Sequence, residues 1–347
     1  MVVRKRKSRK KKKSSGAAGV LLAILLVAIL LAGAAAWLIL APFGPSHETF
    51  VELPPGSSTV QMGRSLGEAG VVRSRFAFDL LRWGKRGTLR AGEYRFDHPV
   101  PVTEIYARIA RGDVYTRTVV IPEGASIFDI AARLEQAGFG PRMDFLDAAR
   151  EQVGLVTDLD PQATSLEGYL FPDTYHFARK ATLGQICATM VRRFRAVAAQ
   201  LELKKDVHAV VTMASLVERE TAVDAERPLV ASVFQNRLAK KMPLMTDPAV
   251  IYGLELDGRW RSALYASDLK LDTPYNTYLH PGLPPSPIAN PGAKALRAAM
   301  RPAQTNYLYF VAAGANPQGH SLFSATLDEH NRNVAGYRHA VRKAGSR

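Results

Sequence analysis

The stretch that decides the fold of the C-terminal half is Met213-Ala-Ser-Leu-Val-Glu-Arg-Glu-Thr221. It ends an almost wholly apolar run, because only one threonine and one serine interrupt the apolar residues between His208 and Glu218. A helix that is apolar on all sides is buried in a core rather than amphipathic. We therefore predict a buried helix over residues 206–220 that carries two glutamates at its C-terminal end.

The two glutamates of this helix, Glu218 and Glu220, continue different apolar stripes. Glu218 follows the stripe that contains Ala214, and Glu220 follows the stripe that contains Leu216, so the helical wheel does not choose between them. A carboxylate at a helix C-terminus faces the negative end of the helix dipole, and partial burial removes it from water. Both effects raise the pKa of a carboxyl group there, as a general acid near neutral pH requires.

Polar and aromatic side chains follow this helix in three segments. A second helix is expected to end near residue 240, residues 246–248 begin a loop, and residues 273–288 form a loop stiffened by prolines. Asp247 is a second carboxylate, although an aspartate before proline is more often a cap or turn residue. Tyrosine and asparagine suit a sugar-binding groove, because they combine an apolar ring face with directed hydrogen bonds. The predicted substrate-binding residues are Asn236, Thr246, Asp247, Tyr252, Tyr275, Asn276 and Tyr278.

The N-terminal end combines a basic tail with a long apolar stretch. Residues 4–13 contain nine basic residues and one serine, and the uncharged residues 14–47 that follow are most apolar over 20–40. About twenty apolar residues cross a hydrocarbon core as a helix, and positive charge keeps its side in the cytoplasm. We predict a basic cytoplasmic tail (1–16) and a transmembrane anchor (17–42) in the cytoplasmic membrane, with everything after it outside. A cleaved signal peptide is the alternative, but its apolar region is normally shorter.

The net charge of +15 does not indicate a nucleic-acid-binding protein. Without the nine basic tail residues, 37 basic residues face 31 acidic ones, a net charge of +6, and no zinc-finger spacing or RNA-binding aromatic pattern is present. The tail suits anionic lipid headgroups better. The eight histidines lack metal-ligand spacing, so we predict no metal and no cofactor. Cys187 is the only cysteine, so an intrachain disulfide is excluded and we expect Cys187 in the core.

The first half contains an internal repeat at an offset of 68 residues. Val51–Ser58 aligns with Val119–Ser126, and both stretches contain a Pro-x-Gly turn. Each copy predicts a strand, the turn, an amphipathic helix ending at glycine and a second helix, with Ser57 or Ser58 and Ser126 as N-caps. The unit looks like the small LysM type of glycan-binding module, and chance similarity of two ordinary α/β units is the alternative. The predicted LysM-like modules span residues 46–115 and 116–160.

Several separate blocks of the chain resemble the YceG-like endolytic murein transglycosylases (the MltG family), which cleave bacterial cell-wall glycan. They occur in the family's order, and the resemblance covers essentially the whole chain beyond the anchor. Within the Glu-basic-Glu-Thr motif the resemblance points to the first glutamate, Glu218, as the catalytic residue. The blocks are residues 166–175, 213–221, 236–238, 246–253, 273–278, 282–288, 319–323 and 329–331.

The family's chemistry implies that one carboxyl group acts first as the general acid and then as the general base. Ordinary glycosidases use two carboxylates and water. Here Glu218 would protonate the oxygen leaving C1 of N-acetylmuramic acid and then take the proton of that sugar's C6 hydroxyl, leaving a 1,6-anhydro end. The implied function is endolytic cleavage of nascent glycan strands that terminates their elongation, with peptidoglycan synthases (penicillin-binding proteins) as candidate partners besides the strands and the membrane.

The fold class predicted is α+β: a transmembrane helix, small LysM-like α/β modules, and a mixed α+β catalytic domain over residues 161–347. The alternative function is a non-catalytic, membrane-anchored scaffold that binds peptidoglycan through the repeat. The two differ in whether purified glycan strands are cleaved to anhydro products.

Overall fold

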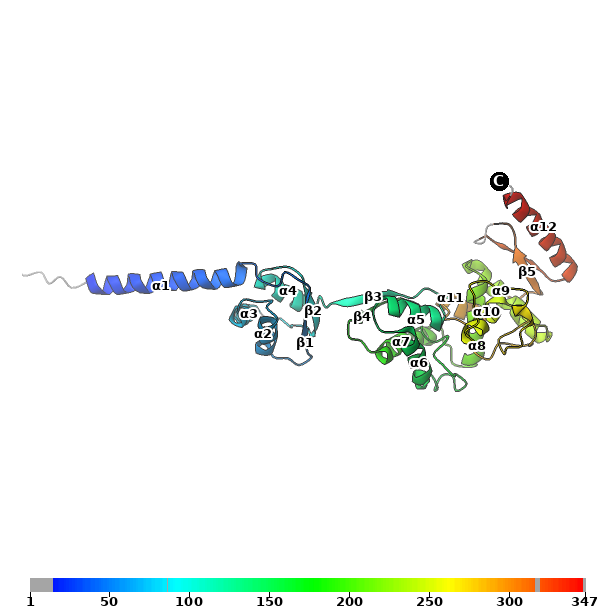
Figure 1. The fold of residues 1–347 in the computed structure, drawn as a ribbon, viewed down its shortest axis with the longest axis horizontal. Helices are drawn as coiled ribbons and strands as arrows, with labels where there is room; N and C mark the ends of the chain where they lie inside the picture. Colours follow the sequence, from blue (N-terminus) through cyan, green and yellow to red (C-terminus); the bar gives the residue numbers. More distant parts are fainter. Residues whose placement is uncertain (1–14, 86, 316–318, 346–347) are drawn as a thin grey trace, which may run out of the picture. The chain divides into compact units, whose positions relative to one another are not determined.

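Residues 15–85, 87–315 and 319–345 are described by a computed structural model, and they adopt the mixed α+β structure that the sequence predicts. Contacts along the chain group into an N-terminal unit, Met1–Thr116, and a C-terminal unit, Arg117–Arg347 (Figure 1). The basic tail at residues 4–13 lies outside the described residues. The three sheets formed by the described strands are all two-stranded, so helices supply most of each core.

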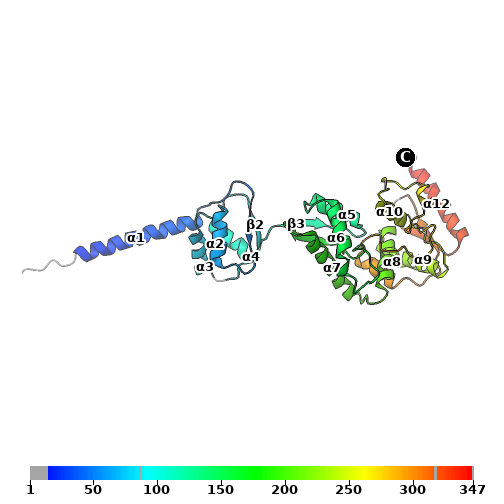
Figure 2. The same ribbon diagram turned by 60° about the horizontal axis from the view of Figure 1, so that its bottom comes forward.

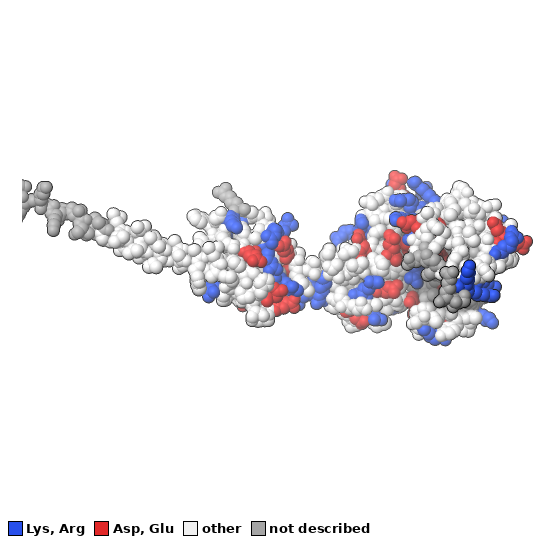
Figure 3. All heavy atoms as spheres, turned by 90° about the horizontal axis from the view of Figure 1, so that it is seen from above, with Lys and Arg blue, Asp and Glu red and all other residues white. Residues whose placement is uncertain are grey.

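The N-terminal unit begins with the apolar helix α1, Ser15–Leu40. Its segment Gly19–Leu40 is 22 residues long and apolar enough to cross a membrane, and it is the one such helix in the described part of the chain. At 1.5 Å per residue it extends roughly 33 Å, close to the thickness of a hydrocarbon core. Figure 3 shows no charged atoms along its described length. The helix therefore matches the predicted anchor within a few residues.

The rest of the N-terminal unit packs helices against one antiparallel strand pair. In this pair Val51 lies opposite Tyr94, and both side chains are buried. Leu53, Phe78 and Ile105 complete the centre of its core. The last residues of α1 pack on the same core. The elements are β1 (Thr49–Leu53), α2 (Thr59–Glu68), α3 (Arg75–Gly84), β2 (Gly92–Phe96) and α4 (Val102–Arg111).

The C-terminal unit contains one continuous core, around which its two strand pairs and its helices are arranged (Figure 2). Strand β3 pairs with β4, and β5 pairs with β6 in antiparallel register. The elements up to the central helix are β3 (Thr116–Val120), α5 (Ile127–Gln136), α6 (Arg142–Glu151), η1 (Gln152–Leu155), β4 (Thr174–Ala178), α7 (Leu183–Gln200) and α8 (Val207–Glu220). After it come η2 (Asp224–Glu226), α9 (Arg227–Ala239), α10 (Asp247–Leu256), η3 (Asp268–Lys270), α11 (Ala293–Met300), β5 (Tyr309–Ala312), β6 (Ser321–Ser324) and α12 (Leu327–Gly345).

The predicted repeat is present as a repeat of elements. Helix α2 starts after Ser58 and α5 after Ser126, and each serine forms a capping box with the third residue of its helix. The turn glycines Gly56 and Gly124 both have a left-handed backbone, at φ 81° and 78°, which a residue with a side chain rarely adopts. Resemblance to LysM modules is not confirmed by these elements.

The two copies of the repeat differ in what they pack against. The first copy has its own core within the N-terminal unit. The second copy has none, because Val119, Ile127 and Leu134 belong to the core that also contains α7, α8 and α11. The boundary expected at residue 160 therefore does not separate two cores, and the second copy is built into the C-terminal unit.

Helix α8 is the buried helix that the sequence predicts. Every side chain from Val211 to Val217 is at most 9% exposed. It packs mainly on α11 and α9, and Cys187 of α7 lies in the same core, as expected. Because α8 is enclosed, its C-terminal end delivers Glu218 and Glu220 to two different surroundings.

Candidate active site

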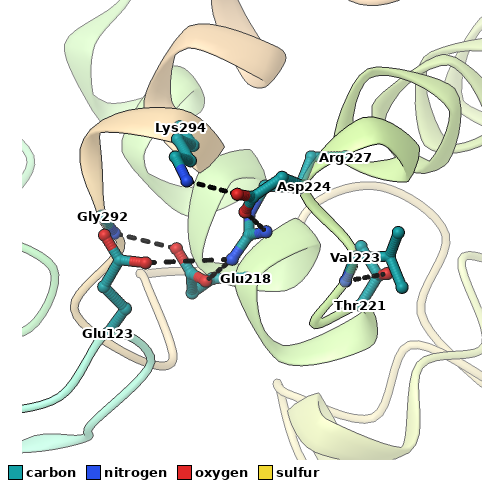
Figure 4. A network of polar contacts seen from close by, with 8 residues as sticks. All are labelled: Glu123, Glu218, Thr221, Val223, Asp224, Arg227, Gly292 and Lys294. Carbon is teal, nitrogen blue, oxygen red and sulfur yellow. Dashed lines mark hydrogen bonds and ion pairs between the residues drawn. The ribbon is translucent and has the colours of Figure 1, made fainter. Parts of the chain in front are cut away.

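The first of these glutamates, Glu218, is held in a network of polar contacts (Figure 4). One carboxylate oxygen lies 2.5 Å from a guanidinium nitrogen of Arg227, and the other accepts the backbone N–H of Gly292 at 2.9 Å. The side chains of Glu218 and Arg227 are only 3% and 5% exposed. Asp224 binds Arg227 at 2.6 Å and also pairs with Lys294. Both oxygens of Glu218 are thus engaged inside the protein.

This network joins segments that are distant in sequence. Gly292 lies at the N-terminus of α11, and Arg227 begins α9. The turn of the second repeat copy also lies here, because the N–H of Gly124 binds the carbonyl of Asn290, and Arg219 donates to the carbonyl of Gly124. The pKa of Glu123, which lies beside Glu218, is raised mainly by burial and secondly by the charge of Glu218. Through its two carboxylate oxygens, Glu218 connects the end of α8 to the starts of α9 and α11.

The second glutamate, Glu220, lines a cavity of about 510 Å³. Known ligand sites fall in the range of about 300–1,000 Å³. Within the described part of the chain, neither carboxyl oxygen of Glu220 has a hydrogen-bond or ion-pair partner. The apolar side chains around the cavity are Phe234, Leu244, Met245, Phe310 and Leu327, and the polar ones are Glu220, Arg237, Asp247, Tyr278, Tyr309, His330 and Asn331.

The surroundings of Glu220 favour its protonated form. Burial is the larger cause, and the charge of Asp247 the second, of a pKa of Glu220 that is raised to about 7. The charge of Arg237 opposes the shift. Removal from water and the nearby negative charge of Asp247 both disfavour the ionised form of Glu220. A carboxyl group with such a pKa can both donate and accept a proton near neutral pH.

Asp247 and Tyr278 form a pair on the cavity wall. The hydroxyl of Tyr278 donates to Asp247 at 2.6 Å, and the pKa of this tyrosine is raised by burial and by the carboxylate. Asp247 is the first residue of α10, which begins here because Pro248 is tolerated in a first helical turn. The expected loop at residues 246–248 is therefore the start of a helix. Of the predicted substrate-binding residues, these two line the cavity.

Two predicted asparagines hold backbone instead of lining the cavity. Asn236 donates to the carbonyls of Thr305 and Tyr307, both at 2.9 Å, and so fixes the segment that leads into β5. Asn276 is fully buried and donates to two carbonyls near η3, while its oxygen accepts the N–H of Tyr278 at 3.0 Å. Asn276 therefore positions Tyr278, and Asn236 positions one wall of the cavity.

The remaining predicted residues are also engaged in the interior. Thr246 is 1% exposed, and its N–H binds the hydroxyl of Thr277. Tyr275 shares a hydrogen bond of 2.7 Å with Ser286. Tyr252 is 3% exposed and hydrogen-bonds Glu167. Thr246, Tyr252 and Tyr275 therefore do not line the cavity at Glu220, although Tyr252 lines a smaller one beside Arg219, and their contact with substrate stays a prediction.

Glu167 is the carboxylate of the block at residues 166–175. It is 1% exposed, and it accepts the N–H of Ile127 at 2.9 Å and the amide of Asn290 at 2.8 Å. Burial raises its pKa to about 8. Inside the core, Glu167 therefore connects α5 of the second repeat copy to the segment before α11.

Several cavity residues were not predicted from the sequence. Arg237 lies beside Asn236, but its guanidinium reaches the carbonyls of Leu308 and Leu244, at 2.7 and 2.8 Å. The ring of His330 stacks on Tyr309 at 5.1 Å, and burial, with the charge of Arg237, lowers the pKa of His330. The resemblance of the block at residues 329–331 was the signal that could have pointed to α12. Among the described residues, no group of His, Cys, Asp or Glu has the arrangement of a metal site.

Comparison with known proteins assigns the chain to a family. The sequence pattern of the YceG-like family matches residues 51–336, and the chain belongs to this family. The endolytic murein transglycosylase of Bacillus subtilis is 34% identical over 307 residues, which cover 81% of this chain and 82% of that protein. The protein of the same name from Streptococcus pneumoniae strain D39 is 28% identical, over 82% of this chain and 57% of its own length.

A solved structure agrees with this relationship. The crystal structure of a YceG-like protein from Listeria monocytogenes is 33% identical, with a TM-score of 0.56. The similarity covers 83% of this chain and 99% of the Listeria chain. The fold of both units is therefore one that a known YceG-like protein shares over nearly its whole length.

Proposed function

We propose that this protein is an endolytic murein transglycosylase that cleaves the bond between N-acetylmuramic acid and N-acetylglucosamine within peptidoglycan strands. Membership of the YceG-like family and the names of its relatives support the reaction class. The observation that carries the proposal is Glu220: a partly buried carboxyl group with a pKa of about 7 that opens on a cavity of about 510 Å³.

We assign the proton-transfer role to Glu220, although the sequence resemblance pointed to Glu218. A catalytic acid must reach the substrate and hold a proton at working pH. Glu220 meets both conditions, whereas both oxygens of Glu218 are bound to Arg227 and Gly292. Glu218 is then a positioning residue that holds the end of α8.

The reaction proceeds with one carboxyl group and no water. Protonated Glu220 donates its proton to the glycosidic oxygen as the bond from that oxygen to C1 of N-acetylmuramic acid breaks. The carboxylate so formed takes the proton of the C6 hydroxyl while O6 bonds to C1. The ring closes as a 1,6-anhydro end, and Glu220 regains its starting proton. Asp247 favours the protonated start, since its charge raises the pKa of Glu220.

The test is digestion of purified peptidoglycan in ¹⁸O-water, followed by mass spectrometry of the products. We expect 1,6-anhydro ends without label. Labelled reducing ends would mean hydrolysis and would refute the proposed reaction. Intact strands that remain bound to the protein would favour the alternative scaffold function.

The same proposal includes a place in the cell envelope. Helix α1 is proposed to span the cytoplasmic membrane with the basic residues 4–13 inside, and the lone suitable helix among the described residues supports it. Protease added to spheroplasts is expected to digest the C-terminal unit. Protection of that unit would contradict the orientation. Glycan binding by the repeat and contact with peptidoglycan synthases stay predictions.

A further inference from the structure

Helix α3 in the N-terminal unit has apolar side chains on two faces. Ala77 and Phe78 are buried in the core of the unit. On the other face Phe76, Leu80 and Trp83 are 65%, 45% and 87% exposed. Their spacing of four and three residues places them along one line of the helix. A row of exposed apolar residues that includes a tryptophan marks an interaction surface.

The position of this row relates it to the membrane helix. Helices α1 and α3 contact each other within the N-terminal unit, and both Figure 1 and Figure 2 show α3 at the edge of the unit from which α1 leaves. The guanidinium of Arg73, just before α3, lies 4.2 Å from the ring of Trp37 and 4.6 Å from that of Phe43. The end of α1 is therefore held against the segment that carries the exposed row.

The charges around α3 favour an anionic partner. Arg73, Arg75, Arg82 and Lys85 lie on or beside the helix. Its single acidic residue is Asp79, one oxygen of which is buried. On the face that Figure 3 shows, the acidic atoms of the N-terminal unit lie away from the end that joins α1. Basic residues beside exposed aromatic and aliphatic side chains are typical of helices that lie in a membrane interface.

We propose that the outer face of α3, formed by Phe76, Leu80 and Trp83, inserts into the outer interface of the lipid bilayer that α1 spans. Tryptophan prefers the headgroup level, phenylalanine and leucine are typical of the apolar face of an interfacial helix, and the nearby cations bind anionic headgroups. Phe76 and Leu80 offer a sugar no hydrogen-bonding group, so a glycan fits this face less well. The inference rests on α1 crossing the membrane, and it makes the N-terminal unit a membrane-bound base.

The experiment uses the full chain in vesicles and the fluorescence of single tryptophans. The chain has three tryptophans, so W37F/W260F leaves Trp83 alone and W83F/W260F leaves Trp37 alone. The vesicles contain phosphatidylcholine brominated near the headgroup, with a minor share of phosphatidylglycerol. We expect blue-shifted Trp83 emission that the brominated lipid quenches, and stronger quenching with phosphatidylglycerol than without it.

A matched pair of variants in the Trp83-only background tests the face itself. Phe76→Ser with Leu80→Ser should lose most of the quenching, because the two neighbours of Trp83 no longer enter the bilayer. Val60→Ser with Val114→Ser changes exposed apolar residues outside α3 and should leave it unchanged. Near-ultraviolet circular dichroism checks that both variants fold. Equal quenching in both pairs would overturn the proposal.

The Trp37-only variant separates this inference from the anchor. Quenched Trp37 with solvent-exposed Trp83 would keep the anchor and refute the docking of α3. Unquenched Trp37 would refute the spanning helix, and the docking inference would fall with it because it rests on that helix. Blue-shifted Trp83 emission without quenching would mean that a second copy covers the face. A response of Trp83 to soluble glycan strands alone would mean that the face binds sugar, and either result overturns the proposal.

Discussion

Glu218 and Glu220 are two residues apart on one helix, yet they lie in regions of different chemistry. Glu218 lies in a closed network with Arg227 and Gly292, where its charge is matched. Glu220 lies at the wall of a cavity, where burial and Asp247 raise its pKa to about 7. The comparison teaches that burial acts differently on two carboxyl groups of one helix: a buried arginine binds the Glu218 carboxylate, whereas at Glu220 burial and Asp247 outweigh the charge of Arg237 and favour the protonated form.

The largest expected effect is on activity in Glu220→Gln. The amide has nearly the same shape but cannot donate and recover a proton, so turnover should fall by about 10²–10⁴-fold. Release of anhydro-muropeptides from purified strands measures it. If Glu220→Gln kept most of its activity, the assignment of the proton-transfer role would have to return to Glu218.

The free energy of unfolding of Glu220→Gln shows whether a loss of activity comes from lost chemistry or from a lost fold. The raised pKa of Glu220 means that the folded wild type binds the proton more tightly than the unfolded chain. The free energy of unfolding that this proton binding contributes is fully present at pH values below the ordinary pKa of glutamate. It is lost as the pH rises through about 7. Glu220→Gln should therefore be at least as stable as the wild type at neutral pH, and more stable in mild alkali.

The next effect is on stability in Glu218→Gln. The change leaves Arg227 buried without its charge partner, and removing one member of a buried pair costs about 3–5 kcal/mol. We expect a loss toward the lower end, since the amide still accepts the N–H of Gly292. Urea unfolding of the full chain in detergent measures it. The folded fraction should keep its rate per molecule, and a fully stable but inactive variant would contradict the connecting role of Glu218.

A smaller effect is expected on the pH profile in Asp247→Asn. Activity that needs protonated Glu220 should fall as pH rises through about 7. Removing the charge of Asp247 lowers the pKa of Glu220, so this alkaline limb should move to lower pH. Asp224→Asn makes the same change of charge beside the Glu218 network and serves as the control. Equal shifts in the two variants would show that the effect is not specific to the cavity.

The smallest effect is expected in Tyr278→Phe. It removes one hydrogen bond to Asp247, and a hydrogen bond to a charged group is worth about 1.5–3 kcal/mol. We expect KM to rise several-fold while kcat changes less, because the pair lines the cavity without transferring the proton. Tyr275→Phe, which loses a bond to Ser286 away from the cavity wall, is the matched control. A larger loss of kcat in Tyr275→Phe would contradict the placement of substrate.

Local sequence determined the elements of this protein. The apolar run predicted α8, and the offset of 68 residues predicted both copies of the strand, turn and helix. Serines after the turns predicted the caps, with the choice between Ser57 and Ser58 left to the structure. The apolar stretch predicted α1. These features depend on the 3.6-residue period, on capping and on glycine conformation, all of which act over a few neighbouring residues.

Tertiary structure alone decided which glutamate faces the cavity and what surrounds it. Both glutamates continue an apolar stripe of α8, so the choice depended on Arg227 and Gly292 occupying one side and on β5 and α12 leaving a space on the other. Asn236 looked like a groove residue but binds carbonyls about seventy residues away. A side chain's direction follows from partners that packing brings together, and their distance along the chain hides them from any local pattern.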